Sequence, residues 1–263
     1  MDKDLVLTDI RDGYRVITLN RPDSLNSFNR SLHAAMNAAL DEAETDKTCR
    51  ALILTGAGRG FCAGQDLSEV EFVPGQKPDL TATLEQNYNP LIRRMRKMPL
   101  PIVCAVNGVA AGGGANVAFA CDIVLAARSA KFIQAFAKIA LVPDCGGTWF
   151  LPSLAGSARA RALAMLAEPI SAEQAEAWGM IWKVVDDAGL MAEANKLAAH
   201  LAKQPTGALA LTKQALDASE TNTLDQQLDL ERDLQGRAGR GPDFAEGVSA
   251  FLEKRAPRFA GGL

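Results

Sequence analysis

The residues best suited to chemistry in this chain are glycines, in the stretch 107–116, Asn-Gly-Val-Ala-Ala-Gly-Gly-Gly-Ala-Asn. The apolar run before it, residues 102–106, predicts a buried strand, and residues 117–121 after it are compatible with a helix. Three successive glycines cost backbone entropy on folding, but they let a ligand approach bare main-chain N–H groups. At a helix N-terminus such groups suit an anion, or a carbonyl oxygen that becomes one. Close packing of helix on strand, without a ligand, explains the glycines equally well.

A second glycine-rich loop, residues 56–66, follows another predicted buried strand at residues 51–55. Its first five residues, Gly-Ala-Gly-Arg-Gly, resemble the start of a dinucleotide-binding fingerprint. That fingerprint needs glycine at its sixth position, where this sequence has Phe61. The sequence also lacks the Gly-x-x-x-x-Gly-Lys-Ser/Thr pattern of a P-loop. The remaining interpretation is a pair of glycine loops, one after each of two strands.

Few side chains offer nucleophilic or metal-binding chemistry. Both histidines, His33 and His200, lie in helix-like segments, which argues against a zinc site and against a Ser-His-Asp triad. The five cysteines have no Cys-x-x-Cys spacing, and we interpret Cys62 and Cys145, beside the glycine loops, as packing residues of a reduced protein. Asp144 has two open roles: an acid/base, or the N-cap of the helix predicted after it.

The composition is that of a globular protein: 263 residues, 48% hydrophobic, 22% charged, with a net charge of −3. This balance gives no support for nucleic-acid binding or for binding to an anionic membrane surface. No apolar run approaches the ~20 residues of a membrane helix. The N-terminus has no basic region followed by a long apolar segment, so no signal peptide is predicted. We therefore expect a cytoplasmic protein.

Predicted strands and helices alternate along the chain with short connections. Strands at 5–7 and 15–20 turn at Asp12-Gly13, and helical spacing of apolar residues predicts a helix over 29–45. Further strands are expected at 123–127, 130–134 and 181–185, and further helices at 80–97, 153–167 and 171–179. Such alternation predicts an α/β fold with largely buried strands. We divide the chain into a core, residues 1–200, and a C-terminal helical region, residues 201–263.

Taken together, the motifs resemble the crotonase (enoyl-CoA hydratase/isomerase) superfamily from near residue 5 to near residue 255. The segments that carry the resemblance are Asn20-Arg-Pro, Leu25-Asn26, Phe61-Cys-Ala-Gly-Gln-Asp66, Asn107-Gly-Val-Ala-Ala-Gly-Gly-Gly114, Cys121-Asp-Ile, Ala130-Lys-Phe132, Gly146-Gly-Thr148 and Ala175-x-x-x-Gly179. The resemblance implies a spiral of ββα units with a C-terminal helical trimerisation region. It also implies a homo-oligomer, either a trimer or a dimer of trimers.

The resemblance further implies an oxyanion hole made by the backbone N–H groups of Ala63 and Gly113. Two fixed donors polarise a thioester carbonyl and acidify the neighbouring C–H bonds by stabilising the enolate. The loop after Phe61 holds the CoA adenine in the family, so Gln65, Asp66 and Leu67 become expected substrate contacts, with a plain turn as the alternative.

The acid/base positions decide which reaction of the superfamily to expect. Hydratases place one glutamate just after the glycines and a second shortly after the Ala-x-Phe segment, where this chain has Asn116 and Phe136. Neither can exchange a proton as a carboxylate does, so hydration is disfavoured, and we expect both residues to contact substrate instead. Asp144 matches the acid/base aspartate of dienoyl-CoA-type isomerases and the nucleophile of aryl-CoA dehalogenases. The dehalogenases also use a histidine base, and no histidine occurs from residue 34 to 199.

Desolvation by Val142, Pro143 and Phe136 is expected to raise the pKa of Asp144, which suits moving one proton between carbons. Further segments (59–67, 88–93, 142–149, 178–182 and 220–225) resemble the subfamily of acyl-CoA isomerases that open an aromatic ring epoxide and shift 3-enoyl-CoA double bonds. Asn116 departs from the small residue expected there.

Other expectations concern the ligand and its alternatives. CoA is part of the substrate, so the resemblance implies no separate cofactor and no metal. Lys254 is expected to meet CoA phosphates across a subunit boundary, with a solvated helix face as the alternative. Besides the isomerase, a hydratase-like or dehalogenase-like enzyme and a non-catalytic CoA-ester binding protein remain open.

Overall fold

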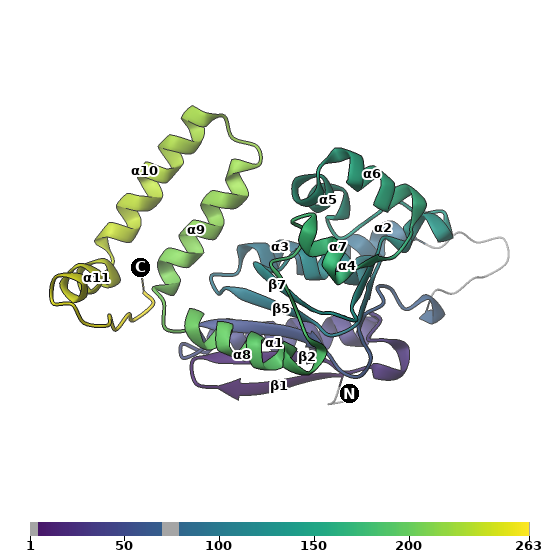
Figure 1. Ribbon diagram of the computed structural model, residues 1–263, viewed down its shortest axis with the longest axis horizontal. Coiled ribbons are helices and arrows are strands. Elements are labelled where there is room, and N and C mark those ends of the chain that lie inside the picture. Colours follow the sequence, from purple (N-terminus) through teal and green to yellow (C-terminus); the bar gives the residue numbers. More distant parts are fainter. Residues whose placement is uncertain (1–4, 70–78, 263) are drawn as a thin grey trace.

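The computed structural model describes residues 5–69 and 79–262 and contains two sheets (Figure 1). The larger sheet has the strand order β1-β2-β3-β5-β7-β10, in which β1 and β2 are antiparallel and all later neighbours are parallel. Its strands are β1 (Val6–Arg11), β2 (Tyr14–Leu19), β3 (Ala51–Gly56), β5 (Ile102–Val106), β7 (Ile123–Ala127) and β10 (Lys183–Val185). The hairpin predicted at Asp12-Gly13 is confirmed, with Gly13 at φ +79°.

The smaller sheet consists of short strands, of which only the one at Lys131–Ile133, predicted at 130–134, was expected from the sequence. They are β4 (Gly60–Cys62), β6 (Val109–Ala111), β8 (Lys131–Ile133) and β9 (Ile170–Ser171). Strands β4, β6 and β8 are parallel neighbours, and each follows one strand of the larger sheet along the chain. The chain therefore repeats one unit: a long strand in the large sheet, then a short strand in the small one. Three residues are too few to show a period, so β4 and β6 were predicted as loops.

Helices cover these sheets, as Figure 1 shows. Their bounds in the core are α1 (Arg30–Thr45), α2 (Leu80–Thr83), α3 (Asn89–Lys97), α4 (Gly113–Phe119), α5 (Gly147–Ala155), α6 (Ser157–Leu166), α7 (Ala172–Ala177) and α8 (Leu190–Leu201). The helix predicted over 80–97 contains a π-helical turn at Leu84–Tyr88. The one predicted over 153–167 is two helices, because Gly156 has φ +79° and turns the chain between α5 and α6. Several helix- and strand-breaking residues in 70–82 predict a surface excursion, and most of that segment lies outside the described residues.

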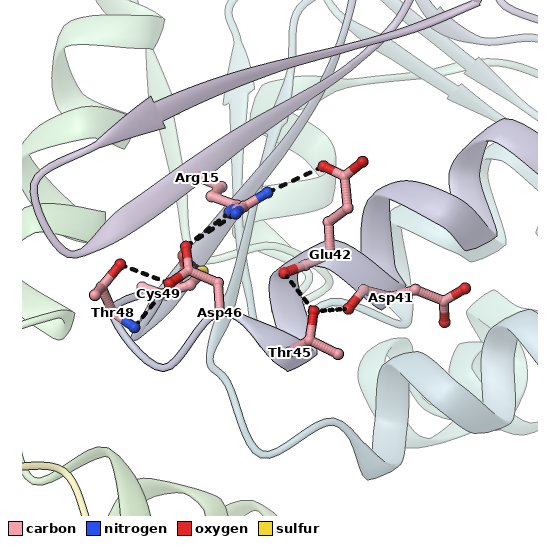
Figure 2. Close-up of polar contacts among 8 residues, drawn as sticks. Arg15, Asp41, Glu42, Thr45, Asp46, Thr48 and Cys49 are labelled. Atoms are coloured by element: carbon pink, nitrogen blue, oxygen red, sulfur yellow. Dashed lines mark hydrogen bonds and ion pairs between the residues drawn. The ribbon is translucent and has the colours of Figure 1, made fainter.

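The C-terminus of α1 is fastened to the large sheet by a polar cluster (Figure 2). The Arg15 guanidinium, on β2, donates to Asp46 Oδ2 from Nη2 at 2.9 Å and to Glu42 Oε2 from Nη1 at 3.2 Å. Asp46 Oδ1 in turn accepts from the backbone N–H and the hydroxyl of Thr48. These hydrogen bonds hold the pKa of Asp46 down to about 2.

After α8 the chain leaves the core as three helices: α9 (Thr206–Ser219), α10 (Leu224–Arg240) and α11 (Pro242–Leu252). In Figure 1, α9 and α10 run side by side away from the core, and α11 lies at the far end from α4 and α5. Lys213 on α9 ties this arm to the core, since its Nζ donates to Met95 O at 2.7 Å and to Asp122 Oδ2 at 3.0 Å. Among the described helices, none combines the length and apolar character needed to cross a membrane.

Candidate active site

The topology of the small sheet brings the two glycine loops together. Strands β4, β6 and β8 lie side by side and parallel, so their carboxyl ends open onto the same edge. The loop after β6 is anchored to the end of β8, since the Gly112 N–H donates to Ile133 O at 2.8 Å. The loop after β4 approaches so closely that a Cβ on Gly64 would lie 2.9 Å from Ala111 O and 3.2 Å from Gly113 N. Both loops, one after each of two strands, thus meet at a single place.

The three glycines after β6 have separate reasons to be glycine. Gly112 has φ +53°, a backbone conformation that disfavours side chains. A Cβ on Gly114 would lie 2.3 Å from Cys62 O, so this glycine allows α4 to pack on β4. Gly113 is the first residue of α4, where an N–H has no intrahelical acceptor, and none of the described groups accepts from it. Packing explains Gly114, and an available donor exists at Gly113.

The second expected donor, Ala63, is placed differently from the prediction. Its N–H donates to the carbonyl of Leu25 at 2.9 Å, and Leu25 itself has the left-handed φ of +50°. Ala63 can therefore donate to a ligand only by sharing this hydrogen bond or releasing it. This competition could not be predicted from residue spacing, because Leu25 is distant in the chain and its conformation is set by the turn before Asn26.

Asp144 lies beside Gly113, in the loop before α5. Its Oδ1 is 3.4 Å from the position that a Cβ on Gly113 would occupy, and this oxygen is buried without a hydrogen-bond partner in the described structure. The N-cap of α5 is Gly146, with no side-chain cap, so the capping role for Asp144 is wrong. Burial raises the pKa of Asp144, and the neighbouring Cys145 thiol opposes that shift only partly. The direction expected for the pKa of Asp144 is thus confirmed, with burial as its cause, although Val142, one of the neighbours expected to desolvate it, is 78% exposed.

The other titratable groups near Asp144 are held neutral. Burial raises the pKa of Cys62 to about 12 and that of Cys145 still further, which makes both thiols poor nucleophiles. His33 is buried with neither ring nitrogen hydrogen-bonded, and burial lowers its pKa to about 4. It packs as an aromatic ring against Tyr88, with ring centroids 4.4 Å apart. A carboxyl group is therefore the proton carrier that this neighbourhood offers.

Two aromatic rings flank the glycines. Phe136 is 6% exposed and its Cζ lies 3.7 Å from the Cβ position of Gly112. Tyr88 is 2% exposed and its Cε1 lies 3.7 Å from the Cβ position of Gly113. Tyr88 was missing from the predicted site, because the π-helical turn that ends at it leaves no trace in residue spacing. Its hydroxyl donates to Gln65 Oε1 at 2.9 Å, which links the aromatic wall to the loop after β4.

The three predicted contacts for the adenine lie together after β4. The carboxylate of Asp66 accepts from Arg21 Nη2 at 2.8 Å and from the Ser68 hydroxyl at 2.6 Å, and these bonds contribute to lowering its pKa. This side chain is thus committed to protein groups. Leu67 is 49% exposed and offers an apolar surface beside the loop.

Two predicted substrate contacts are not at the substrate-facing surface of this chain. Asn116 is 0% exposed, and both ends of its amide are hydrogen-bonded to protein: Nδ2 donates to Asp144 O at 2.8 Å, and Oδ1 accepts from Gln134 Nε2 at 2.9 Å. The prediction that Asn116 contacts substrate directly is therefore wrong. Lys254 is exposed and follows α11, which lies at the far end of the fold from α5 (Figure 1).

The fold and this pair of loops define a member of the crotonase superfamily. The sequence profile of the enoyl-CoA hydratase/isomerase family matches residues 9–262, and the chain belongs to that family. It is 58% identical over 259 residues to the 1,2-epoxyphenylacetyl-CoA isomerase of Escherichia coli K12, covering 98% of this chain and 99% of that protein. It is 47% identical to a probable enoyl-CoA hydratase of Rhodobacter capsulatus, over 96% of each chain. The crystal structure of an enoyl-CoA hydratase from Polaromonas sp. JS666 has a TM-score of 0.90 at 34% identity, covering 97% of this chain and 99% of that one.

These findings confirm the predicted family and the α/β spiral fold. Within residues 5–69 and 79–262, no group of three or more His, Cys, Asp or Glu side chains is arranged to hold a metal ion.

Replacing Asp144 by asparagine is expected to stabilise the protein at neutral pH. Because its pKa is raised, the folded protein holds the Asp144 proton more tightly than the unfolded chain does, so the free energy of unfolding falls as pH rises through the raised pKa. Asp144→Asn removes this loss. Its Tm should exceed that of the native protein at pH ~8, and the difference should vanish below about pH 4, the ordinary aspartate pKa.

The matched control is Asp46→Asn, for which the sign reverses. Since hydrogen bonds hold the pKa of Asp46 down to about 2, its carboxylate stabilises the fold above the ordinary pKa, and this contribution is lost as pH falls toward 2. Calorimetry of both variants from acid to neutral pH measures the two slopes. A lower Tm for Asp144→Asn at neutral pH would contradict the unpaired, desolvated state of Asp144.

Proposed function

We propose that the protein is an acyl-CoA isomerase that converts the ring epoxide of 1,2-epoxyphenylacetyl-CoA to the oxepin-CoA and moves 3-enoyl-CoA double bonds to the 2-position. The relative of this name is 58% identical over almost the full length of both chains. The single observation that carries the proposal is the proximity of an available donor and a buried carboxyl: Gly113 N–H has no acceptor among the described groups, and Asp144 Oδ1 lies 3.4 Å from the Cβ position of Gly113. Such a protein takes part in phenylacetate catabolism, and its free, buried cysteines suit the cytoplasm.

In the proposed reaction the thioester oxygen accepts from Gly113 N–H, with Ala63 N–H as a second donor shared with Leu25 O. Asp144 removes a proton from the carbon beside the thioester carbonyl, and the electron pair moves into the carbonyl to form an enolate. In the 3-enoyl to 2-enoyl conversion the carboxyl then returns the proton to the far carbon of the dienolate, so one C–H bond breaks, one forms and the double bond moves to the 2-position. One proton leaves and one returns, so the substrate is isomerised without a cofactor. The raised pKa of Asp144 suits both steps, because the group is a base when ionised and a ready acid when protonated.

The aromatic walls support an aromatic acyl group. Phe136 and Tyr88 lie beside two successive glycines, where the acyl chain of a thioester held at Gly113 would pass. Flat rings that pack against a flat substrate add dispersion and stacking without polar groups to satisfy. The hydratase alternative is less well supported, since the two positions that would hold its glutamates are the buried amide of Asn116 and the ring of Phe136.

Replacing Asp144 by asparagine tests the proton carrier. The amide keeps the shape of the carboxyl but cannot accept a proton, so we expect the rate of 3-enoyl to 2-enoyl conversion to fall by about 10²–10⁴. The affinity of the variant for a non-reactive CoA ester, measured by calorimetry, should differ little from that of the native protein. Ultraviolet absorbance of the conjugated product measures the rate. Near-native turnover by Asp144→Asn would overturn the assignment of Asp144, and an inactive native protein that still binds CoA esters would favour a non-catalytic binding protein.

A pair of substitutions at Gly113 isolates its N–H group. Proline is tolerated at the first position of a helix and lacks the N–H, whereas alanine adds a Cβ but keeps it. That Cβ would lie 3.1 Å from Cys145 Sγ in both variants, so steric effects are shared. We expect kcat of Gly113→Pro to be about 10²–10³ below that of Gly113→Ala. Equal rates for the two variants would show that the N–H takes no part.

We also propose that the protein is a homotrimer or a dimer of trimers assembled through the C-terminal arm. The arm exposes large apolar side chains around a groove of about 590 Å³, including Phe244, Val248, Phe251 and Leu252. Lys254 follows directly and would approach the CoA phosphates of a neighbouring subunit. Light scattering should give a trimer or hexamer mass for the native protein and a smaller mass for Phe251→Glu. A native monomer would contradict this assembly.

A further inference from the structure

The loop that carries Asp144 has no regular structure of its own to hold it in place. Two successive residues in it, Cys145 and Gly146, have the left-handed φ values +51° and +78°, and only the second is a glycine. Such a conformation in a non-glycine residue persists where surrounding contacts impose it. The carbonyl of Asp144 supplies those contacts, since it accepts from both Gly147 N and Asn116 Nδ2, each at 2.8 Å.

We infer that Asn116 and Gln134 form a buried amide pair that positions Asp144 for the proposed isomerisation. Asn116 lies on α4 one turn after Gly113, so the same helix carries the donor for the thioester oxygen and the amide that holds the Asp144 backbone. The distance between oxyanion donor and proton carrier is thereby set by one turn of helix and one hydrogen bond. This inference rests on the proposed function and adds two residues to it, neither of which contacts substrate.

Gln134 sets the orientation of the Asn116 amide. Its Nε2 donates to Asn116 Oδ1 at 2.9 Å, which leaves Asn116 Nδ2 to face Asp144 O. The reversed amide would place two oxygens against each other at Asp144 and two N–H groups against each other at Gln134. The approach is close, because a Cβ on Gly147 would lie 2.4 Å from Asn116 Nδ2. Glycine at 147 is therefore needed for the amide to reach the carbonyl.

The pair is retained at a cost in stability. Asn116 is 0% exposed and Gln134 is 3% exposed, and Gln134 Oε1 is buried with no partner among the described residues. An unsatisfied buried oxygen carries a desolvation penalty that an apolar residue at this position would avoid. A carboxylate at 116 could not donate to Asp144 O, and its charge would raise the pKa of Asp144 further. Asparagine supplies the donor without the charge.

The decisive substitution is Asn116→Asp, which keeps the shape and the acceptor for Gln134 and, when ionised, loses the donor to Asp144 and adds a negative charge. We expect kcat to fall roughly 10- to 100-fold, since a misplacement of about 1 Å can cost that much, while KM changes less than about threefold. The pH at which kcat rises should move upward. We assign this rise of kcat with pH to the ionisation of Asp144. Burial raises the pKa of its titratable neighbours Cys145 and Tyr88 and keeps both protonated.

Two further substitutions are measured beside Asn116→Asp: Gln134→Met as a second test of the pair, and Thr55→Val as a control for stability. Gln134→Met removes the donor to Asn116 without touching Asp144, so a smaller fall in kcat at unchanged KM is expected. Thr55→Val removes another buried hydrogen bond from a side chain to the backbone, Thr55 Oγ1 to Ala105 O at 2.8 Å, but between β3 and β5. It should lower Tm and leave kcat and its pH profile unchanged. If kcat fell in proportion to the fall in Tm in all three variants, the amide pair would have only a structural role. That result would overturn the inference.

An activity-independent titration separates this inference from the proposed function. The ¹³C resonance of the Asp144 carboxyl, identified by its loss in Asp144→Asn, should titrate at higher pH in Asn116→Asp than in the native protein. An inactive native protein with this shift would refute the isomerase and leave the positioning intact. An active native protein, with unchanged kcat and titration in Asn116→Asp, would refute the positioning alone.

Discussion

The structure depends on one close approach, that of the two glycine loops at the carboxyl edge of the small sheet. Strands β4, β6 and β8 run parallel, so the chain leaves all three at the same edge. The loops can meet only because Gly64 and Gly114 lack a Cβ, which in either case would lie within 2.9 Å of a backbone oxygen. Helix α4 then begins at Gly113 and exposes its first N–H to this edge. The proposed reaction depends on the Gly113 N–H being fixed in that position, where it can donate to a thioester oxygen.

The carboxyl opposite this donor is defined by what surrounds it. No cation of residues 5–69 or 79–262 shifts the pKa of Asp144, unlike that of Asp46, which is lowered by Thr48 and Arg15. Burial alone therefore shifts the pKa of Asp144 upward, and the same burial makes the ionised form costly to the fold. The fold is therefore less stable when Asp144 is ionised, but the raised pKa gives a carboxyl that can both take and return a proton. Asn116 and Gln134 hold that group from behind through its backbone, which leaves the carboxyl oxygen itself uncommitted.

Much of this arrangement could be predicted from the sequence, and the remainder depends on contacts that spacing does not encode. Apolar runs predicted the long strands, the glycine loops marked the meeting point, and the positions of Asn116 and Phe136 directed attention to Asp144. The three-residue strands β4 and β6, the π-helical turn before Tyr88 and the bond from Ala63 N to Leu25 O leave no periodic signal. Asn116 was assigned to the substrate because it stands where hydratases carry a glutamate, and that position does not reveal that its amide bonds to Gln134 and the Asp144 carbonyl. A buried polar residue in an apolar segment, such as Gln134, is the one signal that could have indicated the amide pair.

The most direct test of a single carboxyl that moves one proton is isotope transfer. The native protein is given a 3-enoyl-CoA that carries deuterium at the carbon beside the thioester, in ordinary water, and the product is analysed by mass spectrometry during the first turnovers. Because Asp144 Oδ1 is buried and unpartnered, the account predicts that part of the deuterium appears at the distal carbon of the conjugated product. Complete loss of deuterium to solvent from the first turnover, or a product heavier by one water, would contradict it.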